Sequence, residues 1–330
     1  MSDKKVTIRE LAQAANVSIG TVSRALKGQA GLSAQTRAEV LRVAEELGYD
    51  VGKLRTGKPR RILFLYNRQI DSLATNQFYS VVLHGAEIAC RDAGVSLSLM
   101  SVAAGDDLAT TVRRHDADAL IAMGFFDNET LVAMRACDLP MVLADHFHSG
   151  LRCINTDNVQ GGLLATQHLL DHGAQRPAMI LGPLSHHSVV LRAKGFRRAL
   201  FAAGRLADPD YEVAMDIALP YDEAGRDAMR RLLALAQRPD AVFAYNDATA
   251  LGAMQVCAEA GVRVPEDIRF VGYDDIDTAS SNQPPLTTVR VDKEGLGREA
   301  VMALIDGNTS AGDTLQLAEL IVRESSRASS

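Results

Sequence analysis

Two short amphipathic patterns open the chain. In the first, apolar residues recur at helical spacing over residues 8–15, and Thr7 with Glu10 forms the pattern of a capping box before it. After a tight break, Ser18 is placed to cap a second helix that ends at Leu26. Two short helices joined by a tight turn predict a helix-turn-helix.

A third amphipathic pattern completes this region. Ser33 is placed to cap a helix over residues 36–47, and Gly48 stands at its C-cap position. Three short helices are enough to close a small core, so residues 1–49 are expected to form an all-α domain. An ordinary helical hairpin would explain the apolar spacing of the first two helices equally well.

From residue 61 onward, short apolar runs alternate with amphipathic stretches, the pattern of βαβ units. The rhythm restarts near residue 158, which predicts two similar parallel-sheet lobes. The first lobe is expected at about 61–157 and 287–318, and the second at about 158–286 and 319–330. The predicted fold is therefore an all-α helix-turn-helix domain plus an α/β core of two parallel-sheet subdomains, like that of periplasmic binding proteins, with a cleft at the facing strand ends.

Charge separates the two regions. Residues 1–61 carry 12 Lys and Arg against 6 Asp and Glu, whereas the remainder carries 23 against 35. A basic head on an acidic body suggests a polyanion-binding arm. No apolar run has the length of a membrane span, the charged start lacks a signal-peptide core, and the four cysteines form no C-x-x-C pair. A reduced, cytoplasmic location is expected.

The run VTIRELAQAANVSIGTVSRALKG resembles the head of the LacI/GalR family of transcription regulators. The resemblance implies that the recognition helix opens at Ser18, Ile19, Gly20 and Thr21, and that Arg24 reads bases, where it could contact guanine with two hydrogen bonds. It also implies a set of residues that contact phosphate or cap helices: Thr7, Ser18, Thr21, Ser23, Ser33 and Thr36.

The head departs from the family pattern in two places. Ile19 and Gly20 stand where many relatives carry polar base readers, so readout there should rest on Ile19 meeting a thymine methyl group or on DNA shape. The connector, expected at 50–60, is about one helical turn shorter than in relatives. Leu54 matches the leucine that wedges into the minor groove, and Arg55 follows it. The alternative is that Leu54 packs as a linker residue.

Polar side chains follow several of the predicted strands. Carboxylate, amide and guanidinium groups that converge on a cleft suit vicinal hydroxyls, and an aromatic ring can stack on a sugar. Singly, such Asp and Asn residues are more often helix N-caps, so their convergence supports the interpretation. The candidates for the effector site are Asn67, Phe78, Asp145, Arg192, Asn246 and Asp274.

The resemblance extends to the body, in ILGPLSHHSVVLRAKGF, AYNDATALGAM and VPEDIRFVGYDDID. It implies that Arg192 and Asp274 bind effector hydroxyls and that Asn246 and Asp145 line the cleft, while Asn67 and Phe78 match less closely. Met123 occupies a position that is polar in some sugar-binding relatives.

Other candidate motifs favour structural roles. His168 and His172 have metal-ligand spacing but also fit an ordinary helix C-terminus. His186–His187 belongs to a loop that either touches ligand or faces solvent. Gly295–Gly297 lacks the strand and third glycine of a dinucleotide fingerprint. We expect no catalytic residue, metal or cofactor.

The sequence predicts a homodimeric repressor that binds near-palindromic double-stranded operator DNA and responds to a small molecule, most simply a sugar. A regulator with a purine corepressor is the alternative effector class. A transporter's solute-binding protein would share the body but not the head. An enzyme on an α/β scaffold lacks any nameable nucleophile and base.

Overall fold

The computed structural model describes residues 6–26, 31–47, 49, 58–67, 76–103, 105–216, 218–219 and 221–327. The chain divides into two compact units, Met1–Pro59 and Arg60–Ser330. No helix in these described ranges is long and apolar enough to cross a membrane.

The described part of the smaller unit folds as α1 (Ile8–Ala14), α2 (Ile19–Leu26) and α3 (Ala34–Glu46). The predicted capping box is confirmed: the Thr7 hydroxyl accepts from the Glu10 amide and the Glu10 carboxylate accepts from the Thr7 amide. Ser18 and Ser33 cap the next two helices, accepting from backbone amides at 3.0 Å. The third helix begins two residues before the predicted start, and Gly48 lies outside the described residues.

The apolar faces of these helices meet in one small core. Leu11, Val22, Val40 and Ala44 are all fully buried there. Each helix contributes to this cluster, so none of the three buries its apolar face alone.

The larger unit holds two sheets, each six-stranded within the described residues. In the first, all pairings are parallel and the order is β11 (Gly312–Gln316), β5 (Arg152–Thr156), β4 (Met141–Ala144), β3 (Ala119–Met123), β1 (Arg61–Asn67) and β2 (Ser96–Val102). In the second, the order is β12 (Glu319–Ile321), β10 (Thr287–Arg290), β9 (Arg269–Asp274), β8 (Ala241–Ala244), β6 (Pro177–Leu181) and β7 (Glu212–Ala214), with only β12 antiparallel among these strands.

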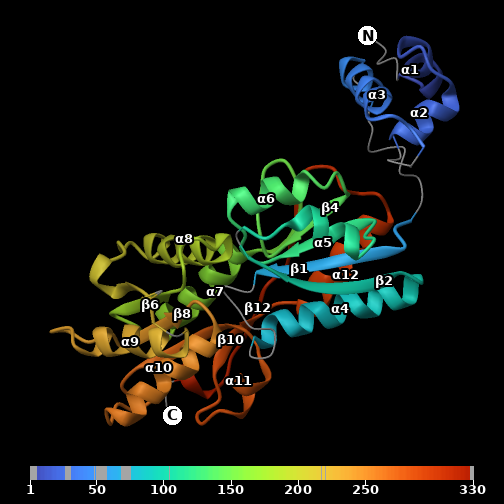
Figure 1. Cartoon of the computed structure of the whole chain (residues 1–330). Helices are drawn as coiled ribbons and strands as arrows, with labels where there is room; N and C mark the ends of the chain where they lie inside the picture. Colours follow the sequence, from blue (N-terminus) through green and yellow to red (C-terminus); the bar gives the residue numbers. More distant parts are fainter. Residues whose placement is uncertain are drawn as a thin grey trace. The chain divides into compact units, whose positions relative to one another are not determined.

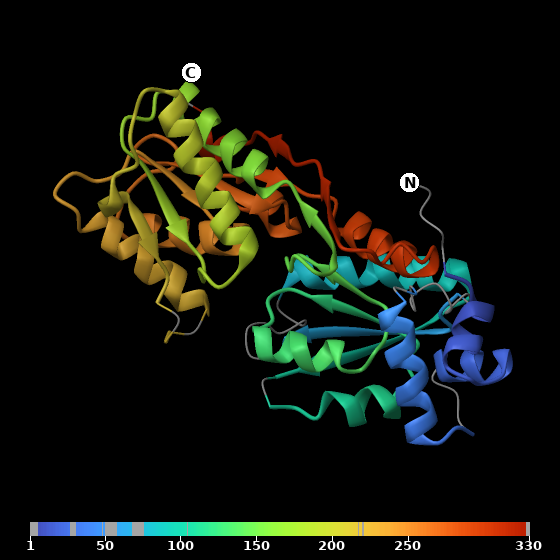
Figure 2. The ribbon, with the colours of Figure 1, turned by 90° about the horizontal axis from the view of Figure 1, so that it is seen from above.

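Helices cover both faces of each sheet (Figures 1 and 2). In the first lobe, Ile62 and Phe64 of β1 pack in the core cluster that contains α4 (Gln77–Ala93) and α12 (Lys293–Ile305). Leu63 and Leu65 point to the other face of the sheet and pack in the cluster that contains α5 (Leu108–Arg114) and α6 (Asn128–Arg135). This alternation is the period of a strand buried on both faces. In the second lobe, the helix pairs are α7 (Asn158–Asp171) with α8 (His187–Ala202) and α9 (Tyr221–Leu233) with α10 (Asp247–Glu259), and α11 (Asp277–Ser281) follows β9.

One predicted lobe boundary is wrong. Residues 287–290 were assigned to the first lobe, but they form β10, which pairs with β9 in the second lobe. Thr287 and Thr288 are fully buried there, and the Thr288 hydroxyl donates to the Asp247 carboxylate at 2.6 Å. The chain therefore returns to the first lobe only with α12.

Candidate effector site and DNA-binding head

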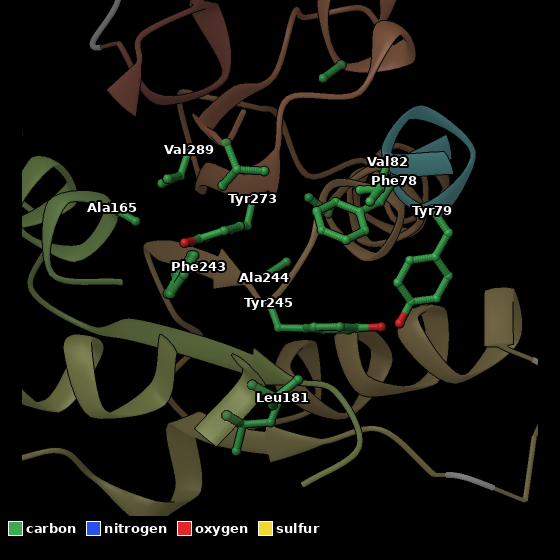
Figure 3. Close-up of a cluster of buried hydrophobic side chains, with 14 of the residues drawn as sticks. Phe78, Tyr79, Val82, Ala165, Leu181, Phe243, Ala244, Tyr245, Tyr273 and Val289 are labelled. Carbon is green, nitrogen blue, oxygen red and sulfur yellow. The ribbon is translucent and has the colours of Figure 1, made fainter. Parts of the chain in front are cut away.

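A crevice between the lobes of the larger unit gathers side chains from both sheets' strand ends. It is narrow, with a volume of about 50 Å³. Its walls are formed by Asn76, Phe78, Tyr79 and Asp145 from the first lobe, and His186, Ser188, Val189, Arg192, Tyr245, Asn246 and Asp274 from the second. Figure 3 shows Phe78 and Tyr79 across from Tyr245, with the two tyrosine hydroxyls pointing toward one another.

Two glycines place the arginine of this site. A Cβ on Gly162 of α7 would lie 2.3 Å from the Arg192 carbonyl oxygen, and one on Gly195 of α8 would lie 2.3 Å from the Val159 carbonyl oxygen. Only glycine at both positions lets the two helix backbones approach so closely. The close approach brings Arg192 beside the start of α7.

Arg192 is buried, with 5% of its surface exposed, and its guanidinium has several partners. Its Nε donates to Asn158 Oδ1 at 2.8 Å, Nη1 donates to the Tyr245 carbonyl oxygen at 2.6 Å, and the guanidinium lies 3.6 Å from the Tyr273 ring centre. Nη2 lies 3.6 Å from Asp274 Oδ1. A buried cation requires such partners, so the guanidinium is fixed in orientation at the crevice wall.

Asp274 ends β9 in an unusual backbone conformation. Its φ is 107° and that of Asp275 is 51°, in the region that favours glycine. Lys293 of α12 donates to the carbonyl oxygens of both, and Arg323 donates to Asp275 Oδ1 at 2.6 Å. Such strain persists only where surrounding contacts fix it, and it is typical of ligand sites.

Asp247 supports this turn from behind. It is fully buried, and it accepts from the Thr288 hydroxyl and, at 3.0 Å, from the Ile276 amide. Burial, together with the nearby Asp274 charge, raises the pKa of this carboxyl to about 8. Asp247 therefore stabilises the turn after β9 and does not line the crevice itself.

Three other predicted effector residues also reach the crevice. Asp145 follows β4 with φ 52°, Phe78 lies in the first turn of α4, and Asn246 accepts from the Thr249 amide at 2.9 Å as the N-cap of α10. Asn246 is therefore a helix N-cap that also lines the crevice.

Asn67 is the predicted effector residue that the structure does not bring to the crevice. Its Nδ2 donates to the Phe125 carbonyl oxygen at 3.1 Å, and it is absent from the crevice walls. The amide fixes the segment after β3 instead.

Two histidines adjoin the crevice. The Phe125 ring stacks on His186 with centroids 5.6 Å apart and meets His146 edge-on at 5.8 Å. Burial lowers the pKa of each imidazole to about 4. His187 also disfavours protonation of His146, and His146 disfavours protonation of His186. Both are neutral at pH 7. Of the two alternatives for the His186–His187 loop, the structure places His186 at the crevice.

Sequence reasoning missed the two tyrosines. Tyr245 ends the apolar run AVFAY and Tyr79 lies on the buried face of α4, so both have the pattern of core residues. Their apolar neighbours gave no signal that both side chains line the crevice between the lobes.

The other histidine pair has structural contacts. His168 Nε2 lies 2.7 Å from the Ser326 hydroxyl, and His172 Nδ1 lies 2.8 Å from the His168 carbonyl oxygen. In the described part of the chain, no three potential metal ligands come together. Gly297 lies in α12, where a Cβ would be 2.0 Å from the Val82 carbonyl oxygen, so it permits close packing on α4.

The predicted DNA-reading residues lie on and beside α2. Ile19 is 46% exposed at the start of this helix, Gly20 is exposed, and Arg24 is exposed with its Nε 3.3 Å from the Gly20 carbonyl oxygen. An apolar side chain with this exposure at a helix start is available for contact with a thymine methyl group.

The hydroxyl residues around α2 and α3 act as caps. The Ser18 and Thr21 hydroxyls lie 2.8 Å apart, and those of Ser33 and Thr36 lie 2.7 Å apart. Ser23 is half-buried in α2. Leu54 and Arg55 lie outside the described residues.

A helix-turn-helix unit joined to a two-lobed core with a polar crevice defines a class: DNA-binding proteins controlled by a small ligand. Residues 7–50 match the family model of bacterial regulatory proteins, lacI family, and residues 166–326 match that of the periplasmic binding protein-like domain.

Similar proteins agree with this class. The chain is 35% identical over 311 residues to the ribose operon repressor of Escherichia coli (strain K12), covering 91% of this chain and 92% of that protein. The transcriptional regulator CelR–cellobiose complex is 31% identical with a TM-score of 0.75, covering 97% and 100%. A lac repressor dimer bound to operator and the anti-inducer ONPF is 27% identical with a TM-score of 0.72, covering 98% and 100%. The chain belongs to the lacI family, and it is a DNA-binding transcriptional repressor controlled by a small molecule, not an enzyme.

Proposed function

We propose that this repressor is a cytoplasmic homodimer that a sugar, bound in the crevice, releases from a near-palindromic operator. The observation that carries the proposal is the buried Arg192–Asp274 pair at the crevice wall. Its donors and acceptors suit vicinal hydroxyls, which both donate and accept, and Phe78 offers an aromatic face for a sugar's apolar side. The names of the ribose operon repressor and of the CelR–cellobiose complex support a sugar.

The mechanism is linkage between two sites. A sugar that binds one arrangement of the lobes better than the other shifts the protein toward it, and the operator affinity changes by the same coupling, typically about 1–3 kcal/mol. Lys293 is the observed connection: it belongs to α12 of the first lobe and donates to the carbonyl oxygens of Asp274 and Asp275 in the second. A change at Asp274 is therefore passed directly to the other lobe.

In the head, we propose that Arg24 and Ile19 read bases, while Thr7, Ser18, Thr21, Ser23, Ser33 and Thr36 position the helices on phosphate. The connector would contribute Leu54 as a minor-groove wedge, with Arg55 beside it. Domain limits of 1–49 for the head, 50–60 for the connector and 61–330 for the core follow from this division. Phosphate contacts predict operator affinity that falls steeply with salt.

The test begins with operators selected from random DNA duplexes at fixed salt. Fluorescence anisotropy then follows operator release as pentoses, hexoses, disaccharides, nucleosides and purines are added. Release by one sugar supports the proposal. Tighter operator binding with a purine, and no response to sugars, would replace it with the corepressor alternative.

Arg192→Ala is expected to weaken the response to that sugar by about 10- to 150-fold, since a charged hydrogen bond contributes about 1.5–3 kcal/mol. Operator affinity without sugar should stay within about threefold of wild type, because the head is a separate unit. The matched control is Arg197→Ala on the same helix, whose guanidinium pairs with Glu212 at the surface. Equal loss in both variants, or loss of thermal unfolding cooperativity in Arg192→Ala, would argue that the change is structural.

A further inference from the structure

A groove at the C-terminal end of α8, on the second lobe, is not part of the crevice. It has a volume of about 720 Å³. Its principal walls are Leu163 of α7, Lys194, Arg198 and Phe201 of α8, and Arg205 and Leu206 of the segment that follows. We name it the α8 groove.

Two large apolar side chains of the α8 groove face solvent. Phe201 is 74% exposed and Leu206 is 85% exposed. A single exposed apolar residue is ordinary on a protein surface. Here two of them lie within one short segment. Two adjacent ones beside a hollow form an anchor site for an apolar partner residue.

The segment that carries Leu206 is held in place. Gly204 has φ 73° and ends the helix, and the Arg205 amide donates to the Leu200 carbonyl oxygen at 2.9 Å. The Arg205 guanidinium donates to the carbonyl oxygens of Ala174, at 3.0 Å, and Gln175. Leu206 is thus presented outward on a fixed turn, which lowers the entropy cost of binding.

The groove is basic although the body is acidic. Lys194 and Arg198 form no ion pair within the described residues, whereas Arg197 pairs with Glu212. No Asp or Glu lies among the described residues that line the groove. Residues 62–330 as a whole carry 23 Lys and Arg against 35 Asp and Glu. The groove is therefore positively charged in a region whose net charge is negative.

We propose that the α8 groove docks an acidic amphipathic helix of a partner protein. Lys194, Arg198 and Phe201 lie at i, i+4 and i+7, on one helix face over about 10 Å, which matches two turns of a partner helix. Leucines of that helix would cover Phe201 and Leu206, and its carboxylates would meet Lys194 and Arg198. A second copy of this groove would oppose like charges, and nucleic acid would leave both apolar side chains uncovered.

The experiment uses the full chain and a fluorescein-labelled helical peptide of about 18 residues with leucines along one face and glutamates on the others. Two control peptides accompany it: one with the same composition in an order that spreads the leucines around the helix, and one with lysine for glutamate. Anisotropy gives each affinity, and sedimentation gives the protein's oligomeric state.

The acidic amphipathic peptide is expected to bind with Kd in the tens of micromolar, and Leu206→Asp should weaken it at least ~10-fold. The matched control is Leu317→Asp, since Leu317 is 86% exposed and lies in the segment between β11 and β12. This change should leave the affinity unaltered. Arg198→Glu should transfer preference to the lysine peptide.

Three results would overturn the proposal. The first is absence of binding, and the second is equal binding of the peptide with dispersed leucines, which would show attraction by charge alone. The third is self-association of the protein that Leu206→Asp abolishes, which would identify a second copy as the occupant. Operator binding and sugar release are read in separate assays, so a failure of the sugar proposal leaves this one standing.

Discussion

At the scale of single residues, Tyr273 shows how much the site depends on side chains that the effector would not touch. Its ring lies under the Arg192 guanidinium and its hydroxyl has no hydrogen-bond partner among the described residues. Burial raises the pKa of this phenol well above its ordinary value. The neutral ring therefore stabilises the guanidinium through a cation–π contact.

Gly161 in α7 lies close to that hydroxyl. Gly→Ala within a helix ordinarily stabilises by about 0.5–1 kcal/mol. Here the new Cβ would lie 2.4 Å from the Tyr273 hydroxyl oxygen, so we expect Gly161→Ala to destabilise the core by roughly 1–3 kcal/mol. Urea unfolding measures this.

Gly20→Ala is the control for helix propensity. A Cβ there would have only the Ser18 hydroxyl within 4 Å, at 3.8 Å, so the head should become slightly more stable. A rise in stability for Gly161→Ala as well would show that α7 can shift away from Tyr273.

At the scale of elements, the head depends on its helix ends. α1 has only seven residues, too short to be stable alone, and its first turn is closed by the reciprocal bonds of Thr7 and Glu10. These two residues secure the helix that packs against α2.

Thr7→Ala should therefore destabilise the head by about 1 kcal/mol, because it leaves an amide of the first turn without its acceptor. Thr7→Ser keeps the acceptor and should cost less. Circular dichroism of the head's melting transition in the full chain measures both. Equal melting for the alanine variant and wild type would contradict a stabilising capping box.

At the scale of the whole molecule, buried ionisable groups link folding to pH. Burial lowers the pKa of His146, His168 and His186 to about 4, from about 6.5 in the unfolded chain. The unfolded chain takes up these protons first, so stability falls as the pH drops from 6.5 toward 4. Asp247 acts in the opposite direction, because its folded pKa is raised to about 8 and the folded state holds a proton that the unfolded chain has released.

We expect the core to lose roughly 3 kcal/mol of unfolding free energy between pH 7 and pH 5, because the three histidines together outweigh the one carboxyl. Asp247→Asn removes the opposing contribution and should make the loss steeper. Urea unfolding across this range measures both slopes. Stability that is flat from pH 7 to pH 5 would contradict neutral buried imidazoles.

The sequence by itself determined the elements and the class of protein. Period 3.6 in the head, short apolar runs in the body and capping residues such as Thr7, Ser18 and Ser33 are local signals, and they predicted the helix-turn-helix and the βαβ pattern. Asp145, Asn246 and Asp274 were recognisable because a polar residue that follows a buried strand must lie at the sheet edge.

Only the tertiary structure decided which strand belongs to which lobe and which side chains share the crevice. β10 was predicted in the wrong lobe because its apolar pattern fits either sheet, and only its pairing with β9 distinguishes them. Asn67 bonds the Phe125 backbone instead of lining the site, and Tyr79 and Tyr245 line it although they have the pattern of core residues. Such placements depend on contacts between residues far apart in the chain, and hydrophobic periodicity carries no information about the partner across a contact.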